Sequence, residues 1–257
     1  MDQFKDYADD RLIHGCIYCG GNADTRDHVP SRCLLERPYP ENLPIVGCCR
    51  SCNQKFSKDE EYFVSLVESA LCGSTDPEKI RRPSVARIMR NSPALRARIE
   101  SARTELDGRV AFLPEDERVA NVMLKLARGH AAFELSQLCC SVPDNFWCGS
   151  LESLPHDQRE AFDSVHFQQI FGETGSRNQQ RMIVTHISLQ SDSGEQHKLG
   201  MLINDWVDVQ DEHYRYLAID DLDGIVIRIV VRDYFACEVA WKLDNNRSTI
   251  SVCEACC

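Results

Sequence analysis

Apolar residues recur three and four positions apart through much of the first half of the chain, which is the spacing of amphipathic helices. This pattern predicts a first helix over 57–71. Ser57 and Glu60 fit a capping box that would begin the helix, and Gly73 would end it. The helix would close the first structural unit of the chain.

Further helices are expected after this unit. Residues 77–106 have a helical pattern that is interrupted at Ser92-Pro93, because a proline disfavours helical backbone in the residue before it. Residues 115–140 carry the strongest helical pattern in the chain, with most apolar positions on one broad face. A short helix is also expected within 155–171.

From Met182 the pattern changes to segments rich in valine, isoleucine and tyrosine, which predicts an antiparallel meander of four strands. Asp223 and Gly224 mark a tight turn between two of them. Residues 235–243 fit either a further strand or a helix packed on the sheet, and 143–149 is expected to be a loop. The four strands are expected at 183–189, 198–209, 214–219 and 225–231.

Two pairs of cysteines near the start of the chain each enclose two residues. Short extended segments are expected between the pairs, at 24–30 and 42–46, and a helix near the second pair. Four thiolates at this spacing are typical of structural zinc, which would stabilise a module with a small core. Cys48 competes with Cys49, but only Cys49 gives the CxxC spacing. The expected ligands are Cys16, Cys19, Cys49 and Cys52.

The length of 257 residues allows one large domain or a small module joined to a larger one. The chain begins with polar residues and has no run of about 18 apolar residues, so neither a secretory leader nor a membrane span is expected. The expected location is therefore the cytoplasm. In that reducing compartment the 14 cysteines are not expected to form a disulfide framework.

The formal net charge of −11 counts against a nucleic-acid binder when it is averaged over the chain. The charge is unevenly distributed, however. Segment 79–103 contains eight basic residues and one acidic residue, whereas 205–223 contains seven acidic residues. This segregation predicts a basic working face and an acidic far side.

Asp27 and His28, between the cysteine pairs, are two groups that phosphodiester hydrolysis uses. A neutral histidine can deprotonate water near pH 7, and a carboxylate can hold a divalent cation that neutralises charge on the phosphate. Adjacent residues on a strand point to opposite faces. The two side chains can therefore share a site only where the backbone bends or at a strand edge.

Together these motifs resemble the HNH endonucleases of bacteria, and the resemblance extends from Cys16 to Phe63. It implies a zinc-bound ββα-metal module. The run from Ser57 to Phe63 is similar to a subset of these proteins. The residues that carry the resemblance are Cys16-x-x-Cys19, Asp27-His28-Val29-Pro30, Asn42-Leu43 and Cys49-x-x-Cys52-Asn53.

The resemblance implies a role for each polar residue of the motif. His28 would be the general base, and Asp27 and Asn53 would hold a catalytic Mg²⁺ or Mn²⁺. Many family members have histidine where this chain has Asn53, but an amide oxygen is an adequate ligand for a hard cation. Asn42 would not touch the metal, and its amide would hold the loop and orient His28. The products would carry 5′-phosphate and 3′-hydroxyl ends.

Basic residues near the module and in the following helices are expected to contact phosphates, which gives affinity independent of sequence. Ordinary solvated charges account for them equally well. The acids Asp59, Glu60 and Glu61 are expected to complement a helix dipole, with a further metal ligand as the alternative. The expected nucleic-acid contacts are Arg50, Lys55, Arg81, Arg82, Arg87 and Arg90.

The expected fold class is α+β. Residues 1–75 would form a treble-clef-like ββα-metal module with structural zinc. Residues 76–257 would form an α+β domain of unassigned role, with helices over about 77–140 and an antiparallel sheet over about 182–243.

The expected function is metal-dependent endonucleolytic cleavage of nucleic acid, with DNA as the expected substrate. The alternative is a non-catalytic zinc module that binds nucleic acid or protein. No membrane partner is expected. A protein partner or a second copy would bind through the C-terminal domain.

Overall fold

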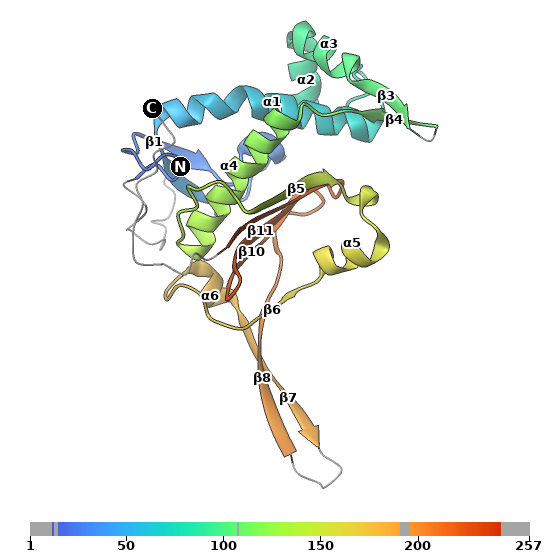
Figure 1. The fold of residues 1–257 in the computed structure, drawn as a ribbon. Helices are drawn as coiled ribbons and strands as arrows, with labels where there is room; N and C mark the ends of the chain where they lie inside the picture. Colours follow the sequence, from blue (N-terminus) through green and yellow to red (C-terminus); the bar gives the residue numbers. More distant parts are fainter. Residues whose placement is uncertain (1–11, 13–14, 107, 191–195, 243–257) are drawn as a thin grey trace.

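A computed structural model describes residues 12, 15–106, 108–190 and 196–242. It has mixed helix and sheet, and all strand pairs within these ranges are antiparallel. The α+β class is thereby confirmed. Figure 1 shows the helices α1 and α4 above a sheet, and a two-stranded arm that projects away from both.

The chain begins with a hairpin followed by a helix. Strands β1 (Thr25–His28) and β2 (Ile45–Cys48) pair with Asp27 opposite Val46 and His28 opposite Ile45. Helix α1 (Arg50–Cys72) follows directly. The connection between the strands, residues 29–44, contains one turn of 3-10 helix, η2 (Arg32–Leu34).

Helix α1 is continuous through the residue at which the sequence predicted a helix start. Ser57 lies inside the helix, and its hydroxyl donates to the Asn53 carbonyl (3.3 Å) instead of capping a new N-terminus. The predicted start at Ser57 is therefore wrong, because the helix already begins beside the second cysteine pair. The end is as expected: Gly73 adopts φ +65°, a left-handed conformation that glycine accepts without strain.

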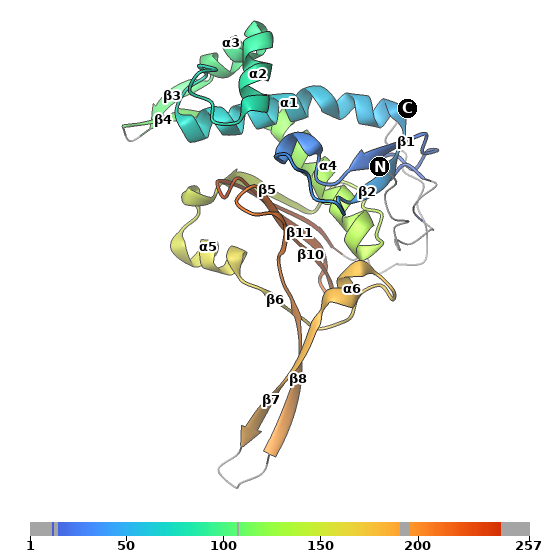
Figure 2. The same cartoon turned by 180° about the vertical axis from the view of Figure 1, so that it is seen from behind.

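Two short helices and a hairpin lie against the C-terminal half of α1 (Figure 2). Helices α2 (Pro83–Asn91) and α3 (Pro93–Ser101) are separated at Ser92, which confirms the predicted interruption. The expected helix does not reach residue 106. Strands β3 (Arg103–Leu106) and β4 (Arg109–Phe112) form a hairpin instead, with Gly108 at φ +74° in its turn.

Helix α4 (Asp116–Leu135) lies at the centre of the molecule. It contacts α1 and β2 with one side and strands of the large sheet with another, which explains its broad apolar face. Gly129 allows the close approach to the first hairpin, since a Cβ there would lie 2.6 Å from a methyl of Val29. Helix α4 therefore joins the N-terminal module to the rest of the chain.

The large sheet has five strands in the order β5-β12-β11-β10-β9. β9, β10, β11 and β12 form an antiparallel meander in which only β10 and β11 match strands of the expected one, and 235–242 is a strand rather than a helix. The outer strand lies at 145–150, where a loop was expected. The strands are β5 (Asn145–Ser150), β9 (Val207–Gln210), β10 (Tyr214–Asp221), β11 (Gly224–Val231) and β12 (Phe235–Lys242).

The first two expected strands belong to a separate sheet rather than to the meander. That sheet has the order β6-β8-β7, and Asp205-Trp206 interrupts the strand that was expected to run unbroken over 198–209. Two short helices, η3 and α5, connect the two sheets, and α6 connects β6 to β7. These elements are η3 (Leu151–Ser153), α5 (His156–Asp163), β6 (His166–Gln168), α6 (Arg177–Arg181), β7 (Ile183–Gln190) and β8 (Gln196–Asn204).

One hydrophobic core extends across the expected domain boundary at residue 75. It contains Leu34 and Leu43 from the first hairpin connection together with Val122 of α4 and Ile227 of the sheet. A smaller core lies under the cysteine pairs and includes Phe133 of α4. The N-terminal module is thus packed against the remainder of the chain. In the described part of the chain, the helices are all too short or too polar to cross a membrane.

Candidate metal centre and adjoining polar cluster

The two cysteine pairs are held by backbone contacts between a turn and the hairpin. Cys16 donates its N–H to the carbonyl of Gly21 (2.7 Å), and Gly20 adopts φ +74° in the turn. Ile17 donates to the carbonyl of Gly47 on β2 (3.1 Å), which places the first pair beside the second. The hairpin and the start of α1 therefore position all four sulfur atoms.

The sulfur atoms of Cys16, Cys19, Cys49 and Cys52 all lie within 4.8 Å of one another. The Sγ atoms of Cys19 and Cys49 are 3.8 Å apart. Four sulfurs at about 2.3 Å from a tetrahedral zinc ion would be separated by about 3.8 Å. This cluster can therefore bind a metal ion such as zinc.

The electrostatics of the cluster favour a bound cation. Burial by itself would raise the pKa of the Cys16 thiol. Backbone hydrogen bonds, with the largest contribution from Cys49, outweigh burial and lower this pKa to about 7. Burial and the neighbouring sulfurs hold the pKa of Cys52 well above its usual range. A dication would remove this repulsion, since metal binding deprotonates coordinating thiols.

Asp27 lies beside the metal centre but faces the interior. The residue is 7% exposed, and its side chain accepts a hydrogen bond from the hydroxyl of Tyr18 (2.8 Å). The ammonium of Lys125, on α4, lies 2.9 Å from Oδ2 and 3.1 Å from Oδ1 of the same carboxylate. Both oxygen atoms of Asp27 therefore already have partners.

Lys125 is the centre of a buried polar group that we call the lysine cluster, made of Lys125, Asp27, Glu60 and Ser31. Its ammonium donates to Glu60 Oε1 and to the Ser31 hydroxyl (2.7 Å). Lys125 is 2% exposed, and although burial opposes its charge, the carboxylates of Glu60 and Asp27 raise its pKa. One cation thus neutralises two acids from different elements.

His28 does not join the lysine cluster. It follows Asp27 on β1, and adjacent strand residues point to opposite faces. Its Nε2 is buried and has no hydrogen-bond partner among the described residues. Burial, assisted by the nearby Arg32 guanidinium, lowers the pKa of His28, so the imidazole is neutral at pH 7.

The two asparagines of the motif are separated from His28. The Asn53 amide approaches the Thr25 hydroxyl (3.5 Å), two residues before Asp27 on the same face of β1. Asn42 is exposed in the turn before β2, and no hydrogen bond joins it to His28 in the described part of the chain. The expected role of Asn42 in orienting His28 has no contact to support it.

This arrangement does not fit a divalent cation shared by Asp27 and Asn53. The ammonium of Lys125 lies where a cation would bind the Asp27 carboxylate. Glu60, expected only as an alternative ligand, is the acid that converges with Asp27. Asp59 instead binds Arg118 (2.6 Å) and Asn121 (2.7 Å), so it lies outside the cluster.

The expected nucleic-acid contacts do not form one patch. Arg50 and Lys55 are exposed near the start of α1, whereas Arg81, Arg87 and Arg90 are exposed near its other end. Arg90 is paired with Glu78 (2.9 Å). These positions are compatible with phosphate contacts only for a ligand that extends along α1.

Arg82 cannot contact a phosphate from this position, which corrects the expectation. It is 2% exposed and donates to the carbonyls of Cys33 and Leu35 (both 2.9 Å). It also lies 3.7 Å from the buried carboxylate of Glu68. These contacts hold the segment between β1 and β2 in place and leave the guanidinium unavailable to a ligand.

The polar environment of Asp27 includes three residues that the sequence patterns did not predict: Lys125, Ser31 and Tyr18. One signal was present, since Lys125 falls three residues after Val122 and four before Gly129 on the apolar face of its helix. A lysine at such a position needs a buried counterion. Which acid supplies it could not be read from the chain.

Comparison with known proteins gave no similar protein: no family model matches the chain, and neither a curated protein nor a solved structure matches it. The function has to be inferred from the site itself.

Proposed function

We propose that this protein is a metal-dependent endonuclease of the HNH type that acts on DNA, with His28 as the general base. The observation that carries the proposal is the state of His28. Its imidazole is neutral and its buried Nε2 has no partner among the described residues, on the hairpin that leads into the second cysteine pair. A general base needs a free lone pair near its operating pH.

The four cysteines would hold zinc as a structural ion in this proposal. Metal analysis is expected to give one zinc per chain, and Cys49→Ser is expected to remove most of it. Cys48→Ser is the matched control, because Cys48 is the adjacent residue and lies outside the sulfur cluster. Loss of zinc from Cys48→Ser, but not from Cys49→Ser, would reassign the ligand.

Catalysis requires more than the zinc site. A divalent cation would reach Asp27 only if the carboxylate left Lys125, whose ammonium would keep Glu60 as its counterion. Asp27, Asn53 and His28 all come from β1 and the first turn of α1, but His28 lies on the face of β1 opposite Asp27. The proposal therefore includes a rearrangement of Asp27 when the cation binds.

The test is incubation of zinc-loaded protein with plasmid DNA and Mg²⁺ or Mn²⁺. The wild type is expected to nick or cut the plasmid, and His28→Ala is expected to reduce the rate at least a hundredfold. His156→Ala, an exposed histidine on α5, is the matched control and should cut at the wild-type rate. Equal rates for wild type and His28→Ala would exclude His28 as the base.

A second candidate function has its own support. Lys125 and Tyr18 occupy the Asp27 carboxylate, as expected if Asp27 is structural and the module only binds nucleic acid or a protein partner. Gel shifts separate the two functions. Binding of DNA without cleavage in any divalent metal, unchanged by His28→Ala, would favour the non-catalytic module.

A further inference from the structure

Strands β7 and β8 form an arm that leaves the body of the molecule (Figure 1). No other described helix or strand lies beside the outer part of the arm in either view. Its base is attached through β6, which pairs with β8. Two-stranded hairpins are marginally stable in water unless one face is covered.

The register makes this arm amphipathic. Residues paired across strands share a face, so Ile183 lies with Ile203, and Ile187 lies with Leu199. Phe167 of β6 is opposite Ile203 and extends the same face. This face contains the polar Thr185, opposite Met201, and its apolar members are Phe167, Ile183, Ile187, Leu189, Leu199, Met201 and Ile203.

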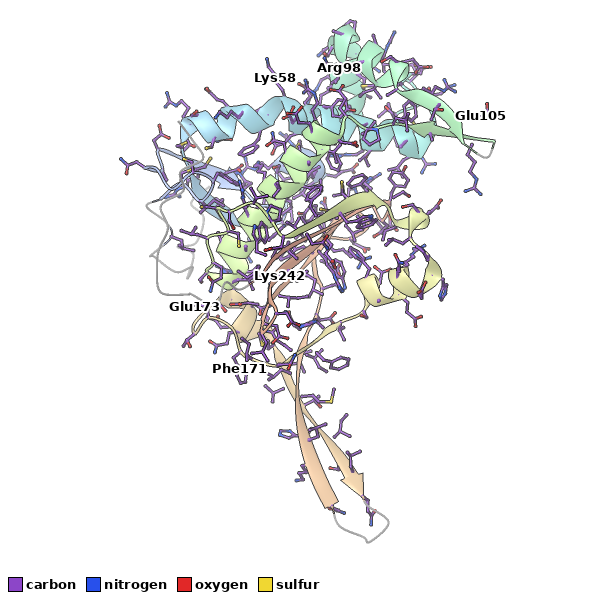
Figure 3. The ribbon with its side chains drawn as sticks, viewed as in Figure 1. Lys58, Arg98, Glu105, Phe171, Glu173 and Lys242 are labelled. Atoms are coloured by element: carbon purple, nitrogen blue, oxygen red, sulfur yellow. The ribbon has the colours of Figure 1, made fainter. Side chains whose placement is uncertain are left out.

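This apolar face is open to solvent. Its members Phe167, Ile183, Ile187, Leu189 and Leu199 are 43% to 56% exposed. The stick view shows the arm side chains projecting outward, with the exposed Phe171 near the base (Figure 3). A largely apolar exposed face of this length normally marks an interaction site.

The opposite face is polar along the outer part of the arm. It carries His186, Ser188 and Lys198, and its apolar pair Val184 and Leu202 lies near the base. Lys198 is the one residue of β7 and β8 with a formal charge at neutral pH, in a chain of net charge −11. The arm thus offers nothing to match a charged ligand.

We propose that the apolar face of the arm binds the same face of a second copy of this chain. Two identical, nearly uncharged faces meet about a two-fold axis without like-charge repulsion, whereas the bodies carry the net negative charge. Because the arm projects, the two faces can meet along their length with the bodies apart. Such a dimer is independent of the proposed nuclease activity.

The size of the face sets the expected affinity. Its five well-exposed members, at roughly 190 Å² each when fully exposed, leave on the order of 500 Å² of accessible area per copy and about 1,000 Å² in the pair. This area is at the lower limit for a specific interface. The dimer is therefore expected to be weak and populated at roughly 10–100 µM chain.

The experiment is sedimentation of the full zinc-loaded chain over this concentration range. The average mass is expected to rise from one chain toward two, and Ile187→Glu is expected to raise the dissociation constant at least tenfold. Ser188→Glu is the matched control, since it puts the same charge on the polar face one residue away. Circular dichroism should show both variants folded.

A photo-crosslinking residue locates the contact. At position 187 it is expected to give a covalent dimer, and at position 188 it should give none. A chain that remains a monomer at 100 µM, or a dimer that Ile187→Glu leaves unchanged, would overturn the proposal. Binding of the monomer to neutral lipid vesicles, abolished by Ile187→Glu, would also overturn it and assign the face to a membrane.

Discussion

Lys125 is the residue on which the polar interior of the N-terminal module depends. It comes from α4, almost a hundred positions after Asp27, and its ammonium neutralises both Asp27 and Glu60. Buried ion pairs contribute modest net stability, but removal of one partner is strongly unfavourable because the remaining charges are left unpaired.

Replacement of Lys125 by methionine should therefore destabilise the protein markedly. The loss in free energy of unfolding is expected to be about 3–5 kcal/mol, since two carboxylates would face each other without a cation. Urea denaturation of zinc-loaded protein measures it. Lys58→Met, on the exposed side of α1, is the control and should change stability by less than about 0.5 kcal/mol. Equal losses of unfolding free energy in the two variants would show that the lysine cluster does not stabilise the protein.

A second residue makes stability depend on pH. His130 is fully buried, stacks on Tyr216 at 3.7 Å, and shares a hydrogen bond with Tyr214 (2.7 Å). Burial lowers the pKa of His130 to about 3. The unfolded chain, with a histidine pKa near 6.5, takes up a proton first as the pH falls.

The sign of this effect follows from the lowered pKa. The contribution of His130 is absent above pH 6.5 and becomes increasingly unfavourable to the fold below it. Unfolding free energy is expected to be about 1.4 kcal/mol lower at pH 5.5 than at pH 7.5 from this group. The matching His130→Phe variant, measured at both pH values with added zinc, should lack this share. An identical pH difference in the two proteins would contradict the assignment.

Among the elements, α1 shows how a local signal can mislead. Ser57 and Glu60 satisfy a capping pattern, yet Cys49 caps the helix and its Sγ accepts from the N–H of Cys52. Glu60 instead binds Lys125. The Glu60 side chain that the capping pattern would use is therefore engaged by a residue far along the chain, and local sequence rules do not describe such a contact.

Lys58→Pro separates a continuous α1 from a helix that starts at Ser57. Proline is tolerated in the first position of a helix but costs about 3 kcal/mol or more in its interior. The structure therefore predicts a large loss in urea stability, whereas Lys58→Ala should be within a few tenths of a kcal/mol of wild type. A stable Lys58→Pro protein would mean that the helix is interrupted at this point.

Strands were predictable where they consist of alternating or β-branched residues and a turn precedes them. β10, β11 and β12 were found close to their expected positions. β5 was missed because Asn145–Ser150 has no strong strand pattern, and pairing with β12 supplies its order. The arm was identified as strands, but its departure from the meander depends on which edges pair.

In the whole molecule, the smaller core joins the cysteine pairs to Ala132 and Phe133 of α4. Metal removal should therefore loosen the first hairpin without unfolding the large sheet. After chelation, amide hydrogen exchange is expected to increase over residues 15–50 and to stay slow in β10 and β11. Global exchange in all elements would instead show that the metal centre stabilises the entire chain.

The sequence by itself determined the cysteine cluster, the mixed fold class and most of the elements, because CxxC spacing and hydrophobic periodicity are local properties. Only the tertiary structure decided that Asp27 faces Lys125, that Arg82 is buried, and that β7 and β8 leave the sheet. Each of these depends on partners far apart in the chain. Such partners are determined by complementary shape and charge in the folded interior, and a local sequence pattern contains no information about either property.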